Sequence, residues 1–161
     1  MSDFDPTMEI FPLNAQRTLL VSGAIDDWQT VRNHEVYTIV DMDGDVDPGV
    51  PEAPGEILYI YFPIADEELP NLQRLHALGR LVAALVEAGQ VVLIHCLLGM
   101  NRSNLLAATA LTYMGMNGSE ALTILRRAQA GALFNDNFAS YVLTLPARGI
   151  QLEPLPPEGN V

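Results

Sequence analysis

The chain has 161 residues, of which 49% are apolar by type and 17% charged. This length and composition predict one compact domain that closes a hydrophobic core without disulfides or structural metals. Twenty acidic residues against eight basic ones, all arginine, give a net charge of -12. That charge argues against nucleic acid and anionic membranes as partners, because a polyanion has to be neutralised by cations. The single cysteine, Cys96, excludes an intrachain disulfide and a cysteine-rich metal site.

Targeting signals are not evident in the sequence. The first ten residues are acidic where a secretory signal would be basic, and the longest mostly apolar stretch, residues 105–116, is too short to cross a membrane. We therefore expect a cytoplasmic protein that makes no membrane contact, and we take it to be a monomer.

Short extended runs separated by turns make up the first half of the chain. Apolar segments rich in β-branched and aromatic residues predict four strands, which are residues 8–11, 18–21, 36–40 and 57–62. Pro63 ends the last of them. Between the second and third strands, Asp26 or Asp27 is expected to cap a short helix that includes Trp28 and Val31.

The second half of the chain has helical periodicity on both sides of one strand. Leucine and valine recur at intervals of three and four over residues 71–88, which predicts an amphipathic helix ending at Gly89. Residues 91–94 are apolar on both faces, as expected of a strand in the middle of a sheet. Further helices are predicted over residues 102–114, 119–130 and 138–145, the second of them capped by Ser119.

This alternation predicts an α/β protein with a single central, mostly parallel sheet and helices packed on both faces. Residues 1–150 are expected to form one domain, and the proline-rich residues 151–161 an extended C-terminal tail.

The acidic segment over residues 41–52 partly matches the pattern of a calcium-binding loop. Its carboxylates fall at the expected positions, but Val46 stands where the sharp turn of an EF-hand needs glycine, and no helix precedes it. We interpret the segment as a solvated acidic loop and predict no metal site.

The candidate chemistry follows the central strand. Cys96 comes directly after this strand, at the edge where open α/β sheets bind ligands, and Arg102 begins a helix five residues later. A short loop into a helix N-terminus can turn its backbone N–H groups toward an anion. An arginine fork suits two oxygens of a phosphate. The segment thus predicts a cradle for a tetrahedral dianion, with the Cys96 sulfur beneath it.

Positive surroundings of this kind favour a thiolate over a thiol, and a thiolate is a competent nucleophile. Gly99 lets the backbone approach the ligand closely. A lone cysteine in an apolar stretch is more often an inert core residue, but the neighbouring Gly99, Arg102 and Ser103 favour a reactive one.

The run from His95-Cys96 through Gly99 to Arg102-Ser103 resembles the HCxxGxxRS signature of cysteine-dependent protein tyrosine phosphatases. It is most similar to the small, atypical dual-specificity branch. The resemblance extends over about residues 19–145 and implies a strand, a phosphate-binding loop (P-loop) and a helix. It also implies catalysis without a metal or other cofactor.

The resemblance implies a role for each residue of the motif. Cys96 would be the nucleophile that becomes a cysteinyl-phosphate, Ser103 would hydrogen-bond the sulfur, and His95 would support the loop. Arg102 would bind the phosphate together with backbone amides of the loop, those of Leu97, Leu98, Gly99, Met100, Asn101 and Arg102.

The family also uses an aspartate about thirty residues upstream as general acid. Asp66 lies thirty positions before Cys96, after a predicted strand and before the long helix. It would protonate the leaving oxygen and later accept a proton from water. Glu67 and Glu68 are the competing carboxylates, since an acidic surface loop needs no function.

The implied function is hydrolysis of phosphotyrosine, with phosphoserine and phosphothreonine as further candidates, in a phosphorylated protein or peptide. Three alternatives stay open: a catalytically weak phosphate-binding module (a pseudophosphatase), a phosphatase of a non-protein phosphoester, and an arsenate reductase that uses an external thiol. Leu97, Leu98 and Met100 predict an apolar rim, and the absence of lysine disfavours inositol phospholipids.

Some conspicuous residues receive no catalytic role. Asn135 follows Phe134 where many relatives carry Pro-Asn, and no function is assigned to it. Arg126 and Arg127 are candidates for an extended anion-binding surface. Four others are interpreted as fold residues: Trp28, His34, His76 and Tyr113.

Overall fold

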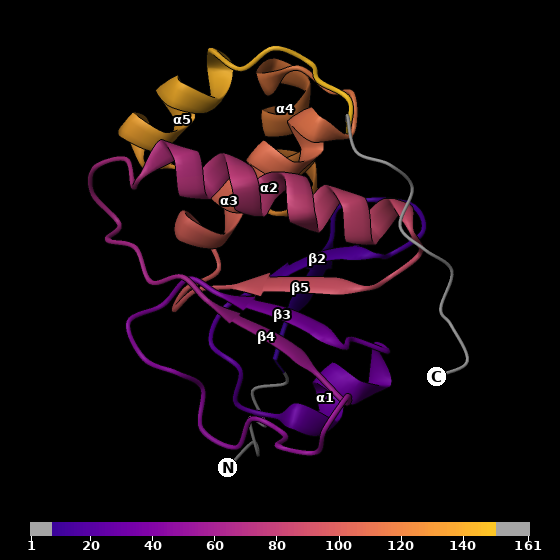
Figure 1. Cartoon of the computed structure of the whole chain (residues 1–161). Helices are drawn as coiled ribbons and strands as arrows, with labels where there is room; N and C mark the ends of the chain where they lie inside the picture. The colour runs from indigo at the N-terminus through magenta and orange to yellow at the C-terminus, as the bar shows by residue number, and fades with distance from the viewer. Residues whose placement is uncertain (1–7, 151–161) are drawn as a thin grey trace.

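The computed structural model describes residues 8–150, so the predicted tail over residues 151–161 lies outside the described part (Figure 1). Its centre is a five-stranded sheet in the order β1-β2-β5-β3-β4, in which only β1 runs antiparallel to its neighbour. The strands are β1 (Ile10–Pro12), β2 (Leu19–Ser22), β3 (Thr38–Asp41), β4 (Leu58–Tyr61) and β5 (Val92–His95). The expected mostly parallel sheet is confirmed.

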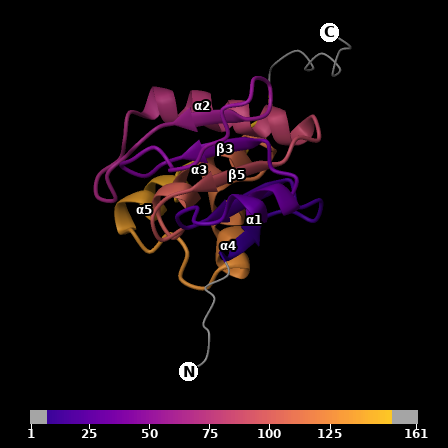
Figure 2. The same cartoon turned by 90° about the horizontal axis from the view of Figure 1, so that it is seen from below.

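Helices cover both faces of this sheet, as predicted (Figures 1 and 2). The helix α1 (Trp28–Asn33) packs on one face, and four helices lie on the other. These are α2 (Leu72–Glu87), α3 (Arg102–Tyr113), α4 (Gly118–Ala128) and α5 (Asp136–Leu143). None of the helices in residues 8–150 is both long and apolar enough to span a bilayer.

The side chains of β5 alternate between these two layers. Val92 and Ile94 join the large core under α2 and α3, whereas Leu93 joins the smaller core beside α1. By the same alternation His95 faces the α1 side and Cys96 the α3 side. At the end of β5 the side chains of His95 and Cys96 therefore lie on opposite faces of the sheet.

Strand register brings three chain segments to that edge. His95 at the end of β5 pairs with Ser22 of β2 on one side and with Asp41 of β3 on the other. Because these strands are parallel, the residues that follow each of them emerge side by side. The loop after β5 consequently lies between the segments that begin at Gly23 and Met42.

Two helix starts differ from the prediction. The N-cap of α4 is Asn117, not Ser119, and it forms a capping box in which the Asn117 side chain accepts from the Glu120 N–H and the Glu120 side chain accepts from the Asn117 N–H. This reciprocal pair satisfies two backbone donors, which Ser119 could not do. Asn135 caps α5, which therefore begins two residues earlier than expected.

Candidate active site

The loop between β5 and α3 is held by its carbonyl groups. The Asn104 side-chain amide donates to the carbonyls of Gly99 (3.1 Å) and Met100 (2.8 Å), and the Ala24 N–H donates to the carbonyl of Leu97 (3.0 Å). Asn104 lies in α3 and Ala24 in the segment after β2, so the loop carbonyls point outward, toward these neighbouring elements. Its N–H groups are then left to face the interior of the curve.

Most of these N–H groups lack a protein acceptor. Within residues 8–150, the Gly99 N–H donates to the Cys96 sulfur at 3.2 Å, and the remaining loop N–H groups make no hydrogen bond. They are those of Leu97, Leu98, Met100, Asn101 and Arg102. A curve of unpaired backbone donors at a helix N-terminus is an anion-binding arrangement.

Gly99 is required by the shape of this curve. Its φ is +70°, and a Cβ at this position would lie 2.6 Å from the Gly23 nitrogen and 2.7 Å from the Ser22 carbonyl carbon. The loop thus packs directly on the backbone that follows β2. Only glycine fits both the left-handed conformation and this close approach.

Cys96 forms the floor of the loop. Its side chain is buried, and its Sγ lies 3.2 Å from the Gly99 nitrogen and 3.4 Å from the Ser103 Oγ. Both groups can donate to a thiolate, whose charge is stabilised by such contacts. Ser103 is fully buried in the first turn of α3, so its hydroxyl is fixed beside the sulfur.

The guanidinium of Arg102 is hydrogen-bonded along one edge and has an unpartnered N–H on the other. Its Nη1 donates to the Asp43 Oδ1 at 3.1 Å. Its Nε is buried and has no hydrogen-bond partner among the described residues. A buried, unpartnered guanidinium N–H is costly unless an acceptor binds there. The free edge of the fork is therefore suited to the oxygen of a bound oxyanion.

The acidic loop over residues 41–52 is not simply solvated, which corrects the prediction. Asp43 pairs with Arg102, and Asp47 accepts from the His95 Nε2 at 2.6 Å. The loop follows β3, and β3 lies next to β5 in the sheet. Sequence periodicity does not reveal this strand order, which brings Asp43 to Arg102 and Asp47 to His95.

Beneath the loop, His95 belongs to a buried polar network. The Tyr59 hydroxyl donates to Asp41 and lies 3.0 Å from Asp47, and the Asp41 Oδ1 lies 3.7 Å from the His95 Nε2. Burial disfavours the imidazolium, but the hydrogen bond and charge of Asp47, together with Asp41, outweigh it and raise the pKa of His95. His95 was expected to support the loop, and its side chain contacts Asp47 and Asp41 beside it.

The same network bears on metal binding. Ligand atoms of Asp41, Asp47 and His95 lie within 4.8 Å of one another. Each of these side chains already has a protein partner, since His95 bonds Asp47 and Asp41 accepts from Tyr59. The donor set is therefore used within the protein, and we assign no metal to it.

Asp66 is fastened to the phosphate-binding loop. It lies between β4 and α2, where its Oδ2 accepts from the Asn101 side-chain amide (3.0 Å) and its Oδ1 from that of Asn135 (2.9 Å). The Asn101 Oδ1 in turn accepts from the Asn135 N–H at 2.9 Å. The neighbouring Glu67 contributes only its backbone carbonyl, at 3.2 Å from the Asn135 amide. Of the three acids in this segment, Asp66 is the one whose carboxylate meets the loop.

Two residues at this site were missed by sequence reasoning. Asn135 was noted but given no role, although its side chain binds Asp66. Asp43 was assigned to a solvated loop. Each residue had a signal in the sequence. Asn135 is a good helix-capping residue directly before α5, and Asp43 comes two residues after the end of β3, where open α/β sheets bind ligands.

Other side chains around the loop differ in exposure and bonding. Leu97, Leu98 and Phe134 are 55%, 71% and 59% exposed, so the loop and the segment before Asn135 carry apolar side chains at the surface. The Arg126 Nε donates to the Ala132 carbonyl at 3.2 Å. That contact braces the chain after α4, which differs from the extended anion-binding role considered for Arg126.

Comparison with known proteins agrees with this geometry. A family model described as "Polymorphic toxin system, DSP-PTPase phosphatase" matches residues 15–116, which is more than half of the chain. The chain belongs to this phosphatase family. The matched segment contains Asp43, Asp66, Cys96 and Arg102, and the resemblance to the dual-specificity branch is confirmed.

Solved structures show the same phosphatase fold. Human DUSP28 matches with a TM-score of 0.70 and 22% identity, over 84% of this chain and 90% of its own. A mouse putative dual specificity phosphatase complexed with zinc tungstate has a TM-score of 0.69 and 20% identity, over 84% of both chains. The human tyrosine phosphatase-like serine/threonine/tyrosine-interacting protein has a TM-score of 0.67 and 16% identity, over 84% of this chain and 93% of its own. No curated protein matches the sequence.

Proposed function

We propose that the protein hydrolyses phosphomonoesters through a cysteinyl-phosphate on Cys96. The observation that carries this proposal is the position of the Cys96 Sγ. It lies under a loop of unpaired N–H groups, 3.2 Å from the Gly99 nitrogen and 3.4 Å from the Ser103 Oγ. The unpartnered Nε of Arg102 adds a charged donor to the same loop.

In the first step, the Cys96 thiolate attacks phosphorus and a sulfur–phosphorus bond forms while the ester phosphorus–oxygen bond breaks. Three phosphoryl oxygens accept from the loop N–H groups and Arg102, which stabilises the charge that they carry in the transition state. Asp66 gives its proton to the leaving oxygen. The asparagine amides that hold Asp66 keep its carboxyl group beside the loop.

In the second step, water attacks phosphorus while Asp66 takes one of its protons. The sulfur–phosphorus bond breaks, and inorganic phosphate leaves. The electron pair returns to sulfur, where the hydroxyl of Ser103 and the N–H of Gly99 stabilise the thiolate. The cycle restores the starting protonation of both Cys96 and Asp66 and requires no cofactor.

The proposed substrate is a phosphorylated protein or peptide, with phosphotyrosine preferred over phosphoserine and phosphothreonine. The exposed side chains of Leu97, Leu98 and Phe134 support this preference, because they offer apolar contacts to an aromatic ring beside the phosphate. A serine phosphate carries no ring to reach them.

Hydrolysis of p-nitrophenyl phosphate by the parent and by Cys96→Ser tests the proposal. We expect turnover to fall at least about a thousandfold in the variant, because a serine hydroxyl is far less ionised than a thiol. Binding of tungstate to the variant should persist, since the loop N–H groups remain. A parent protein that binds tungstate without turning over any aryl phosphate would instead identify a pseudophosphatase.

The proposed role of Asp66 as general acid is tested by comparing substrates with different leaving groups. In Asp66→Ala the loss of kcat/KM, which reports the first step, should be small for p-nitrophenyl phosphate and about a hundredfold for phenyl phosphate, whose leaving oxygen needs a proton. Glu68→Ala is the matched control, because it removes a nearby carboxylate for which no contact with the loop is seen in residues 8–150. An equal loss for both leaving groups would overturn the assignment of Asp66 as general acid.

A further inference from the structure

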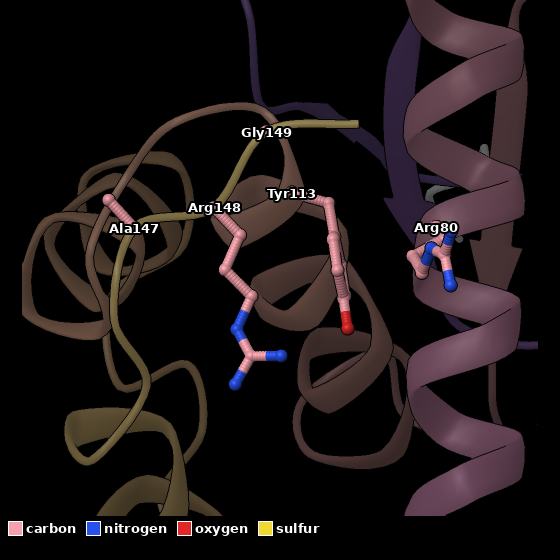
Figure 3. Close-up of a pocket in the computed structure, with 5 residues that line it drawn as sticks. All are labelled: Arg80, Tyr113, Ala147, Arg148 and Gly149. Carbon is pink, nitrogen blue, oxygen red and sulfur yellow. The ribbon is translucent and has the colours of Figure 1, made fainter. Parts of the chain in front are cut away.

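A second pocket lies at the far end of α3 from Cys96. It is a cavity of about 440 Å³ between α2, α3 and the segment after α5 (Figure 3). Five residues line it, which are Arg80, Tyr113, Ala147, Arg148 and Gly149. Arg102 and Tyr113 are the first and last residues of α3, so the pocket is separated from the phosphate-binding loop by the length of this helix, roughly 17 Å.

Two of the eight arginines of the chain, Arg80 and Arg148, line this pocket, here called the arginine pocket. Neither guanidinium makes a hydrogen bond or an ion pair within residues 8–150. Arg32 and Arg102 pair with the carboxylates of Glu56 and Asp43, whereas Arg17, Arg74 and Arg127 also form no ion pair within residues 8–150. What distinguishes Arg80 and Arg148 is that both line one pocket. Two like charges without a carboxylate are favourable in one pocket when an anion joins them.

Arg148 is an exposed residue whose backbone is held by the fold. Its backbone N–H donates to the Thr112 carbonyl at 2.7 Å, which fastens the chain after α5 to the end of α3. Its guanidinium carbon lies 5.7 Å from the centre of the Tyr113 ring. Figure 3 shows the two side chains extending side by side, with Arg80 across from them on α2. An arginine stacked in this way loses less freedom on binding a ligand.

The Tyr113 side chain, which lines the pocket, is held by hydrogen bonds through His76. The Tyr113 hydroxyl is hydrogen-bonded to the His76 Nδ1 at 2.8 Å, and the His76 Nε2 is bonded to the Tyr141 hydroxyl at 2.5 Å. Burial lowers the pKa of His76, and the positive charge of Arg148 lowers it further. The His76 imidazole is therefore neutral and positions the Tyr113 and Tyr141 hydroxyls. The positive charge of the pocket comes from the two arginines.

We propose that the arginine pocket binds a phosphate-type oxyanion between Arg80 and Arg148, as a site separate from the catalytic loop. The fork of each guanidinium matches two oxygens of such a group. The cavity has the size of a small-ligand site and is lined mainly by polar atoms. The oxyanion is either a free phosphate or the phosphate of a phosphorylated peptide.

Titration of the full ¹⁵N-labelled chain with inorganic phosphate tests this site separately from the catalytic one. The amide resonances of Arg148 and Gly149 report on the arginine pocket, and those of Gly99 and Met100 report on the catalytic loop. We expect saturable shifts at both places. Shifts at Gly149 without shifts at Gly99 and Met100 would argue against phosphate binding at the catalytic loop and leave the arginine pocket supported, and turnover of p-nitrophenyl phosphate tests catalysis independently of both.

The decisive variant is Arg80→Gln/Arg148→Gln, in which binding at Gly149 should weaken at least about tenfold because two charge-assisted hydrogen bonds are lost. Its matched control is Arg74→Gln/Arg127→Gln, which removes the same charge from two arginines that do not line the pocket. Unchanged binding in the decisive variant, or equal weakening in the control, would overturn the proposal.

Glu153 and Glu158 are the side-chain carboxylates that follow Arg148 in the sequence. The titration is therefore repeated with both changed to Gln, and the absence of a saturable shift at Gly149 in both backgrounds overturns the proposal. A phosphotyrosine peptide added to Cys96→Ser distinguishes the two sources. Tighter binding than free phosphate at Gly149 assigns the site to a phosphopeptide, and equal or weaker binding assigns it to the free anion.

Discussion

The Nη1 of Arg102 donates to the Asp43 Oδ1 at 3.1 Å, and the Nε of the same guanidinium is buried without a partner among the described residues. Asp43 thereby holds the guanidinium by one edge and leaves the other edge toward the loop. It also places a negative charge beside the site of a dianion. Asp43 is a positioning residue with two opposing effects, on orientation and on charge.

Asp43→Asn separates these effects, because the asparagine oxygen can still accept from Arg102. Loss of the negative charge should strengthen inhibition by phosphate, with Ki falling about three- to tenfold for a partly exposed pair. Asp43→Ala also loses the acceptor, so KM should rise and the gain in phosphate affinity should disappear. Inhibition constants for the three proteins check this, and weaker phosphate inhibition in Asp43→Asn would contradict it.

Asn135 is expected to act on turnover through Asp66. Asn135→Ser keeps a side chain that can cap α5 but is too short to reach the Asp66 carboxylate. We expect kcat for phenyl phosphate to fall several-fold with little change in the free energy of unfolding. Asn137→Ser is the control, because within residues 8–150 the Asn137 side chain hydrogen-bonds to the Glu67 backbone carbonyl and not to Asp66. Equal effects of the two variants on kcat would argue against the Asn135–Asp66 contact.

The His95 network predicts a pH-dependent stability. Folding raises the pKa of His95 above its ordinary value of 6.5, since Asp47 and Asp41 outweigh the effect of burial. The stabilisation is therefore complete below the ordinary value and is lost as the pH rises through the higher native value. Melting temperatures measured between about pH 5.5 and about pH 9 should fall with rising pH in the parent.

Asp47→Asn removes the charge but keeps an oxygen near His95. The decline in melting temperature should shift to lower pH and become smaller, because the native pKa of His95 moves back toward the ordinary value. A histidine titration followed by NMR gives that pKa directly. A parent His95 that titrates below 6.5 would contradict the proposed role of the two carboxylates.

Gly99→Ala should damage both the fold and the site. Its left-handed φ of +70° and the contact of 2.6 Å with the Gly23 nitrogen leave no room for a methyl group. We expect a loss of about 1–3 kcal/mol in the free energy of unfolding and strongly reduced phosphate binding. Gly115→Ala is the control, because its φ is +98° but nothing lies within 4 Å of the added methyl. Its cost should be smaller, with phosphate binding intact, as urea unfolding and phosphate titration can show.

The sequence by itself determined the central strand, the loop and the helix that carry Cys96 and Arg102. These are local features, since an apolar strand, a glycine and a helix start follow one another within a few residues. Asp66 was predicted from the family resemblance, because that family has an aspartate about thirty residues before the cysteine, and its role as general acid remains a prediction. The cap of α4 was misplaced because Ser119 and Asn117 are both good capping residues, and only the Asn117–Glu120 pair decides between them.

Tertiary structure alone decided the partners of these residues. Asp43 and Asp47 reach Arg102 and His95 because β3 lies beside β5 in parallel register, a strand order that no local pattern encodes. Asn135 reaches Asp66 across 69 positions of sequence, and Arg148 reaches Tyr113 at the end of α3. Periodicity fixes which face of an element is buried, whereas contacts between distant segments depend on how the elements pack.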